Sequence, residues 1–373
     1  MTSIPTDGLV ISGLAVTSPY GIGEAAFTEG LAAGRRAVAP LDGGMWPGDR
    51  PVPYGEAGLI PGFDIPGLLG RKGTRSMDRL TGIAVVTTGL LLERYGAGAA
   101  ADPEGTGLVL GVPGSLQSCM SFTEDALTGE KPYYVEPSRF PNTVLNHPTG
   151  RCAIRHDLRG PNASVSGGAG TGLLALNYAS RLLRAGHADA LLCGAAEEFT
   201  VQRARLTRAV TGEEGGPLGE GAAVFLLESA AHAREGGRVP LAAVLGSRFR
   251  SFGSVERAGR ALEACVSAVL EDTGTDARDL AAVAPSGAHG ALGAQETAAL
   301  DAVLGASPPR TELRPLLGDT TTASTALQLA ALVAPALRRP ADAGRPALVT
   351  FVDRDGTAGC TLVRPLVEEL AHG

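Results

Sequence analysis

Short apolar runs alternate along this chain with longer segments in which apolar residues recur at helical spacing. In the first half the pattern predicts, in order, a strand, a helix, a strand, a helix after a small-residue turn, and two paired strands: 9–16, 79–95, 107–113, 170–183, 188–194 and 222–228. Apolar runs of four to eight residues between helical patterns favour βαβ units with sheets buried on both faces.

The second half repeats this order of elements. The corresponding segments are 241–245, 255–270, 280–285, 322–337, 347–352 and 360–363. Two unrelated α/β domains are the alternative, but the shared order favours two duplicated βαβαβαββ halves, at 8–232 and 238–367. The predicted fold is therefore an α/β five-layer αβαβα sandwich, in which the Ala-rich helices lie between two sheets because small side chains allow close packing.

Residues 114–159 form an insertion in the first half that is rich in Pro and turn residues. Long insertions in compact folds are often functional or lie at interfaces.

Composition excludes several classes of protein. The chain has 373 residues, of which 44% are hydrophobic, and a net charge of −7. A large core is therefore available, and nucleic acid is not an expected partner. No apolar stretch is long enough to cross a bilayer, and residues 1–8 do not have the pattern of a signal peptide. Five scattered cysteines without metal-ligand spacing predict a cytoplasmic protein with reduced, mostly buried thiols and no zinc site.

Four motifs stand in a recognisable order. Ser-Gly at 12–13 leads to Ser-Pro-Tyr-Gly-Ile-Gly at 18–23, and Phe-Pro-Asn-Thr at 140–143 precedes Gly-Pro-Asn-Ala-Ser-Val-Ser-Gly-Gly-Ala-Gly-Thr-Gly at 160–172. Gly-Glu-Gly-Ala-Ala-Val follows at 219–224. Together these motifs resemble the β-ketoacyl synthases of the thiolase superfamily, along nearly the whole chain. The resemblance implies the thiolase fold.

Active members of that family use a Cys nucleophile at the tip of a strand-to-helix elbow, two His residues and a Lys, and the Cys thiolate is favoured by the helix N-terminus. When the motifs are aligned, this sequence has a different type of residue at each of these four catalytic positions. The Cys position falls on Ala169, the first His on Pro285, the Lys on Arg314 and the second His on Asp319. A loop of the family that gates the site corresponds to 353–356. The resemblance thus predicts a chain that does not catalyse condensation.

A chain that keeps the scaffold but has lost every catalytic residue resembles the chain length factors, the β-subunits of type II polyketide synthases. Segments 127–135, 140–146 and 152–162 are closer to the factors of highly reducing, polyene-forming systems. The resemblance implies a heterodimer with an active ketosynthase, no cofactor of its own, and phosphopantetheine-linked acyl chains on acyl carrier protein as substrate. It also places the chain-length-setting positions at Gln117, Met120 and Glu124, for which an ordinary helix surface with Met120 in the core is the alternative.

Other interpretations remain open at this point. A thiolase-fold acyltransferase could rely on His289 or Ser166, and a homodimeric acyl-binding protein would also keep the scaffold. A hydrolase triad of Ser286, His289 and Asp319 has no Gly-x-Ser-x-Gly elbow to support it. The glycines at 167–172 lack the Lys-Ser/Thr of a phosphate loop.

Charged clusters have plainer interpretations. The pairs at 197–198 and 213–214 are expected to be solvated acids, because adjacent side chains on one element point apart. Two basic clusters could dock an acidic carrier protein or could simply be solvated helix faces: Arg71, Lys72, Arg75 and Arg79; and Arg203, Arg205 and Arg208.

Overall fold

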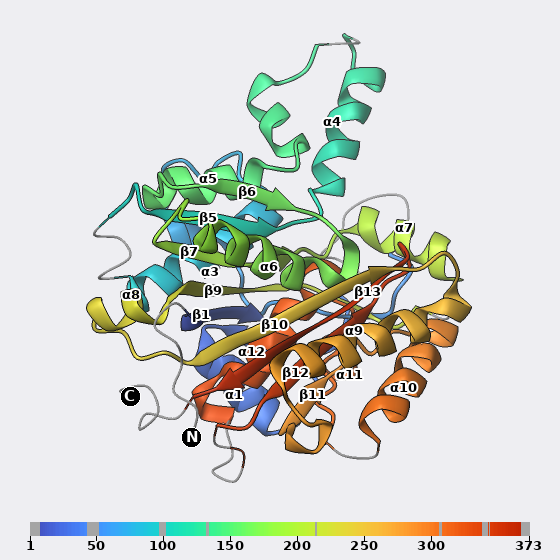
Figure 1. The fold of residues 1–373 in the computed structure, drawn as a ribbon. Coiled ribbons are helices and arrows are strands. Elements are labelled where there is room, and N and C mark those ends of the chain that lie inside the picture. Colours follow the sequence, from blue (N-terminus) through green and yellow to red (C-terminus); the bar gives the residue numbers. More distant parts are fainter. Residues whose placement is uncertain are drawn as a thin grey trace.

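One continuous sheet carries both halves of the molecule (Figure 1). The computed structural model describes residues 8–42, 52–96, 102–131, 134–212, 215–305, 308–337, 342 and 344–366. Within these residues the strands run in the order β11-β12-β13-β10-β1-β9-β7-β5-β6, with β2 paired to the end of β1. The bounds of the main strands are β1 Leu9–Ser18, β5 Thr106–Gly111, β6 Asn162–Val165, β7 Ala190–Glu197, β9 Gly221–Ser229, β10 Ala242–Ser251, β11 Ala282–Ala284, β12 Ala347–Val352 and β13 Thr357–Pro365.

The two halves have the same topology. In the first, β1 pairs antiparallel with β9 and β9 antiparallel with β7, and β5 runs parallel to β7 and β6. In the second, β10, β13, β12 and β11 repeat this sequence of pairings, and a parallel bridge from Val283 to Arg310 stands where β6 stands in the first half. Each half also has a register shift at the same place, between Ile11 and Gly13 and between Val244 and Gly246. A short antiparallel pairing of β1 with β10 joins the halves.

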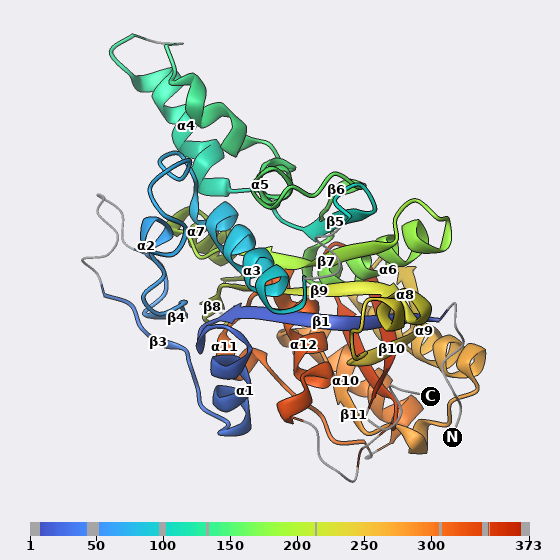
Figure 2. The ribbon, with the colours of Figure 1, turned by 90° about the vertical axis from the view of Figure 1, so that its left-hand side faces the viewer.

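Helices complete the five layers (Figure 2). The central layer consists of α6 (Thr171–Arg184) and α12 (Ser324–Val333), which pack between the two halves of the sheet in the largest core cluster. Helices α3 (Arg79–Tyr95) and α5 (His147–His156) cover the outer face of the first half, and α9 (Ala258–Thr273) and α10 (Gly290–Leu304) that of the second. A Cβ at Gly172 would lie 2.6 Å from the Ala326 nitrogen, so a small residue is what lets α6 approach α12.

Most predicted elements are present with small changes of boundary. Helix α3 has the predicted bounds, whereas the predicted helix over 322–337 is divided. It begins as the 3₁₀ turn η8 (Thr321–Ala323), continues as α12, and ends before η9 (Pro335–Leu337), because Pro335 cannot continue the hydrogen-bonded ladder. The remaining elements are β2 Gly21–Ile22, α1 Glu24–Ala32, β3 Ala39–Pro40, β4 Glu56–Gly58, α2 Ile65–Leu69, η4 Gly168–Gly170, α7 Val201–Thr211, β8 Leu218–Gly219, α8 Ala230–Glu235, η6 Val255–Arg257, η7 Ala277–Asp279 and α11 Arg314–Leu317.

The insertion projects away from the sandwich. Helix α4 (Leu116–Thr128) and the 3₁₀ helix η3 (Pro137–Thr143) pack against each other through the Phe122 and Phe140 rings, whose centroids are 5.8 Å apart. We call these two elements the arm. Figures 1 and 2 both show α4 standing clear of the layers. No residue of α4 or η3 is buried by the rest of the described chain.

Candidate functional site

A sharp turn between β6 and α6 forms the elbow that the sequence predicts. After Val165 the chain passes through Gly167 and Gly168 into η4, and α6 begins at Thr171. Gly168 has a φ of 55°, which favours glycine, and a Cβ at this position would collide with the carboxylate of Asp353. The Thr171 hydroxyl donates to the Gly168 carbonyl and accepts from the Gly167 N–H. The local sequence therefore fixes the turn and the direction of the backbone amide that follows it.

Ala169 stands at the tip of this elbow, and its side chain is a methyl group without nucleophilic chemistry. Its backbone is held on both sides. The N–H donates to Asp353 Oδ2 at 2.5 Å, and the carbonyl accepts from the Thr325 hydroxyl at 3.1 Å. The loop at 353–356 is thus in direct contact with the elbow. The resemblance predicts this loop at the site, but no local pattern predicts that Asp353 meets the elbow amide, since the two segments lie far apart in the chain.

Arg314 and Asp319 form an ion pair of 2.5 Å between Nη2 and Oδ2. Asp319 Oδ1 also accepts from the Thr321 N–H at 2.8 Å, and the Arg203 guanidinium donates to the Asp319 carbonyl at 2.7 Å. Burial opposes ionisation of Asp319, but the charges of Arg314 and Arg203 outweigh it and hold the pKa of this carboxyl below its usual range. The residues predicted at the Lys and second His positions therefore pair with each other, and neither is left free for proton transfer.

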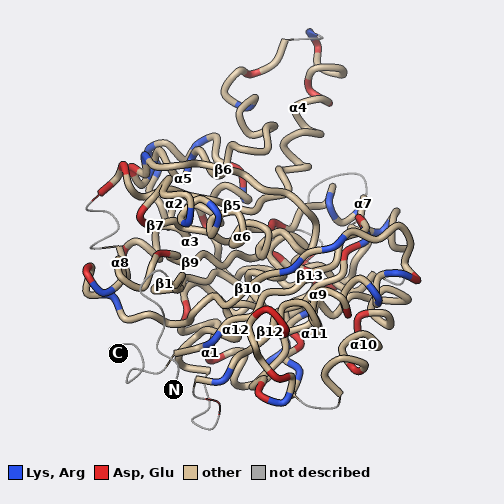
Figure 3. The backbone as a smooth tube through the Cα atoms, in the orientation of Figure 1, with Lys and Arg blue, Asp and Glu red and all other residues tan. Residues whose placement is uncertain are grey.

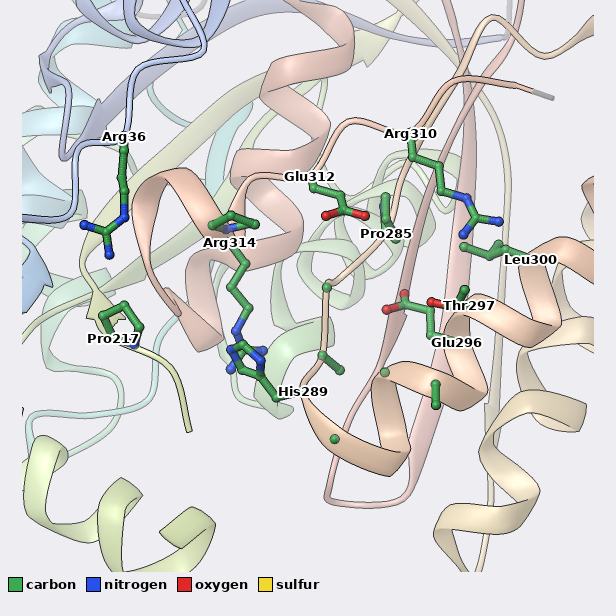
Figure 4. Close-up of a pocket in the computed structure, with 16 residues that line it drawn as sticks. Arg36, Pro217, Pro285, His289, Glu296, Thr297, Leu300, Arg310, Glu312 and Arg314 are labelled. Carbon is green, nitrogen blue, oxygen red and sulfur yellow. The ribbon is translucent and has the colours of Figure 1, made fainter. Parts of the chain in front are cut away.

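Pro285 follows β11 and lines a cavity of about 520 Å³ together with His289 and Arg314 (Figure 4). Proline carries no proton donor or acceptor on its side chain. Next to it, the Ser286 hydroxyl donates to Glu296 Oε2 at 2.6 Å, and burial raises the pKa of Glu296. Burial and the neighbouring Arg314 lower the pKa of His289. Within the described residues no group of three or more His, Cys, Asp or Glu side chains could hold a metal ion.

The rival catalytic groups are not assembled. Ser286 is bonded to Glu296 and Asp319 to Arg314, so neither side chain completes a triad with His289. Ser166 lies exposed after β6, and among the described residues no hydrogen bond joins its side chain to a base. The site therefore consists of the elbow, the loop at 353–356 and the polar network around Asp319. Among the residues that the structure describes, no nucleophile is placed beside a base in it.

One expectation about charge was wrong. Glu197 and Glu198 are buried, because β7 extends past its predicted end to Glu197, and Glu198 follows it directly in the interior. The Glu198 carboxylate accepts from the Leu80 N–H at 3.0 Å and the Ser115 hydroxyl at 2.7 Å. Burial, with the nearby charge of Asp78, raises the pKa of Glu198 to about 8. The other pair, at 213–214, lies outside the described residues.

The residues of the two predicted basic clusters do not all lie on the surface. Arg203 points inward, where it contacts Glu197 and the Asp319 carbonyl, and Arg208 lies over the Tyr54 ring. Arg79 is paired with the buried Glu220. These three residues hold the fold together, and Arg205 is half-buried. Of the two predicted clusters, the members classed as exposed in the described chain are Arg71, Lys72 and Arg75.

Gln117, Met120 and Glu124 lie on α4, and all three are exposed. Their spacing places them on one helix face, together with Leu127. The opposite face carries Phe122, and also Ser118 and Asp125, which bond to Asp78 and Arg139. Met120 therefore does not belong to the core of this chain.

Comparison with known proteins agrees with this geometry. A family model described as "Beta-ketoacyl synthase, N-terminal domain" matches residues 6–233. The chain belongs to the β-ketoacyl synthase family, within the thiolase superfamily. It is 28% identical over 359 residues to the oxytetracycline polyketide putative β-ketoacyl synthase 1 of Streptomyces rimosus, covering 87% of this chain and 83% of that one. With the 3-oxoacyl-[acyl-carrier-protein] synthase 2 of Vibrio cholerae it shares 30% identity over 216 residues, and the match spans about half the length of each, 51%.

Solved structures extend the match to the whole fold. The ishigamide ketosynthase/chain length factor superposes with a TM-score of 0.88 at 40% identity, covering 96% of this chain and all of that one. A chain of the AntDE:AntF structure, a type II acyl-carrier protein in complex with its ketosynthase, superposes with a TM-score of 0.81 at 17% identity. The match covers 97% of this chain and all of that one, and it supports the fold alone. In the described part of the chain, no helix has both the length and the apolar character needed to cross a membrane.

Proposed function

We propose that this β-ketoacyl synthase family member is a non-catalytic, chain-length-determining subunit of a type II polyketide synthase. In this proposal it pairs in the cytoplasm with an active ketosynthase and forms part of the wall of the tunnel in which the acyl chain grows on acyl carrier protein. The site supports this through the replacement of all four catalytic positions by Ala169, Pro285, Arg314 and Asp319. The similarity to a ketosynthase/chain length factor at 40% identity supports the same class.

The arm is the observation that carries the proposal. The arm exposes large apolar side chains: on the outward face of α4 Met120 is 51% exposed and Leu127 64%, and Phe140 of η3 is 55% exposed. A protruding helix pair with no buried residue has no core of its own, and exposed apolar groups that gather in this way mark an interface. A partner that covers the arm would bury these side chains and stabilise it.

The edge of the sheet supports the same interface. Among the described strands, β6 pairs only with β5, so its other edge is open. Open strand edges invite pairing with another chain. Figures 1 and 2 place β6 and the arm at the same end of the molecule, so that one partner can cover both.

A basic surface beside this end supports docking of an acidic carrier protein. Arg151 and Arg155 of α5 donate to the carbonyls of Gly73 and Leu69, both at 2.8 Å. This brings them to the loop that bears Arg71, Lys72 and Arg75, and Figure 3 shows basic segments around α5. In the described part of the chain none of these five side chains is paired with a carboxylate. An unpaired basic surface on a chain with net charge −7 complements an acidic partner.

The test is co-purification of the chain with a candidate ketosynthase from the same pathway. Charges introduced by Met120→Glu and Leu127→Glu on the outward face of α4 should abolish the complex, since an interface core disfavours unpaired charge. Val239→Glu is the matched control, because Val239 is an exposed apolar residue, 39% exposed, between α8 and β10. Loss of the complex in the control, or its survival in both arm variants, would contradict the proposal.

A further inference from the structure

The backbone N–H of Ala169, at the elbow, already donates a hydrogen bond to a side chain. Asp353 Oδ2 accepts the Ala169 N–H, at the N-terminal end of the layer-forming helix α6. Gly168 is required for this approach, because any Cβ there would collide with the Asp353 carboxylate. The contact thus depends on two separate features of the sequence, a glycine in the elbow and an acid in the loop.

Asp353 is fixed in place by its own loop. Its Oδ1 accepts the Asp355 N–H at 2.7 Å, and its backbone N–H donates to the Thr357 carbonyl at 2.8 Å. The Gly356 N–H donates to the Asp353 carbonyl at 3.1 Å, and the Phe252 N–H donates to the Gly356 carbonyl at 2.7 Å. Asp353 is only 8% exposed. Burial raises the pKa of Asp353, whereas its hydrogen bonds from the Ala169 and Asp355 N–H groups favour the ionised form. The other side chains whose charges act on it are acidic, Asp355 and Asp319, and within the described residues it has no cationic partner. It is a buried carboxylate whose ligands are backbone amides.

This position matters for acyl transfer from a thioester. In that reaction a thiolate attacks the carbonyl carbon and forms a new C–S bond. The bond to the pantetheine sulfur then breaks, and the departing thiolate takes up the proton that the attacking thiol released. Between these events the carbonyl oxygen carries negative charge, which backbone N–H groups at a helix N-terminus stabilise. At this elbow the N–H is bound to a carboxylate, so a developing oxyanion would have to displace Asp353 and would meet its negative charge.

We propose that Asp353 is a second block to acylation, independent of the missing nucleophile: it occupies the elbow amide and places a negative charge beside residue 169. Restoring the nucleophile alone is then insufficient. The same charge disfavours a thiolate at this position, since like charges a few ångströms apart in a partly buried site repel strongly. This inference goes beyond the proposed function and holds whether or not the chain pairs with a ketosynthase.

The experiment compares three variants of the full chain: Ala169→Cys, Ala169→Cys with Asp353→Asn, and Ala169→Cys with Asp355→Asn. Asparagine removes the charge and leaves only a neutral acceptor, which a developing oxyanion displaces from the Ala169 N–H more easily than a carboxylate. Asp355→Asn removes a charge from the same loop without touching the elbow. Alkylation of the introduced elbow cysteine by iodoacetamide across pH 6 to 10 is followed by peptide mass spectrometry, which separates it from the five native cysteines. Acylation by an octanoyl-N-acetylcysteamine thioester is followed by intact mass.

The proposal predicts that Asp353→Asn lowers the pH midpoint of alkylation of the introduced cysteine by about one unit or more, and raises its rate at pH 8 about ten-fold or more. Asp355→Asn should change the rate by less than about two-fold, since Asp355 is exposed and solvent screens its charge. Acylation should be detected only in the Asp353→Asn background. Equal alkylation profiles with and without Asp353→Asn would overturn the proposal. If that variant does not keep the melting temperature of Ala169→Cys, Asp353→Ser replaces it, with the same predicted outcome.

Discussion

Glu198 provides a quantitative test of how the arm is attached to the core. Its carboxylate accepts from the hydroxyl of Ser115, which also caps the start of α4, and from the Leu80 N–H at the start of α3. Its pKa is raised to about 8, first by burial and then by the charge of Asp78. We therefore expect Glu198 to be mostly protonated in the folded protein at neutral pH and ionised in the unfolded chain.

The sign and size of the effect follow from this difference. A group with a raised pKa in the folded state contributes stability that is complete below its unfolded pKa and is lost as pH rises through its folded pKa. For Glu198 the window runs from about 4.5 to about 8. At pH 7, keeping Glu198 protonated in the folded state lowers the free energy of unfolding by an amount on the order of 3 kcal/mol. This follows from about 1.4 kcal/mol for each unit by which the pH exceeds the pKa of the unfolded chain.

Glu198→Gln mimics the protonated acid and removes that cost. We expect it to raise the melting temperature at pH 7 by about 4 °C for a chain of this length, and to flatten the dependence of the melting temperature on pH between about 5 and 8. Glu124→Gln, an exposed position on α4, is the control and should do neither. Scanning fluorimetry at a series of pH values measures both. A Glu198→Gln variant that is less stable than the native chain at every pH would refute the reasoning.

Three further predictions concern the site and the surface. Arg314→Ala leaves the largely buried Asp319 without its ion-pair partner and should lower the free energy of unfolding, measured by urea titration, by about 2–4 kcal/mol. Adding Asp319→Asn should restore much of this loss. An Arg314→Ala variant with unchanged stability would contradict the pairing. Replacing Arg71 and Arg151 by Glu should weaken carrier-protein binding about ten-fold at low salt and much less at high salt, measured by calorimetry; a salt-independent loss would argue against charge-driven docking. Met120→Trp should shorten the longest product of the reconstituted synthase, and an unchanged product profile would remove Met120 from the tunnel wall.

Much of the fold could be predicted because periodicity and small-residue turns are local. Helix α3 has its predicted bounds, and the order of strands and helices repeats in both halves as the pattern indicates. The elbow at Ala169 can be predicted for the same reason, since the glycines that allow it adjoin it in sequence.

The features that could not be predicted from the sequence depend on contacts between segments that are distant in the chain. Nothing local to Asp353 indicates that it meets the elbow amide 184 positions away, and nothing local to Arg203 indicates that it reaches the Asp319 carbonyl. The pattern predicts solvated acids at Glu197 and Glu198 because the end of β7, and the donors that satisfy them, depend on other parts of the chain. Buried polar groups are therefore where prediction from pattern failed.

The most direct test of the central claim is native mass spectrometry of the chain co-expressed with its candidate ketosynthase, after incubation with malonyl- and acyl-loaded carrier protein. We predict a 1:1 complex in which elongation requires both subunits, and in which the acyl group is found only on the ketosynthase. A stable homodimer of this chain that takes up an acyl group by itself would contradict the claim.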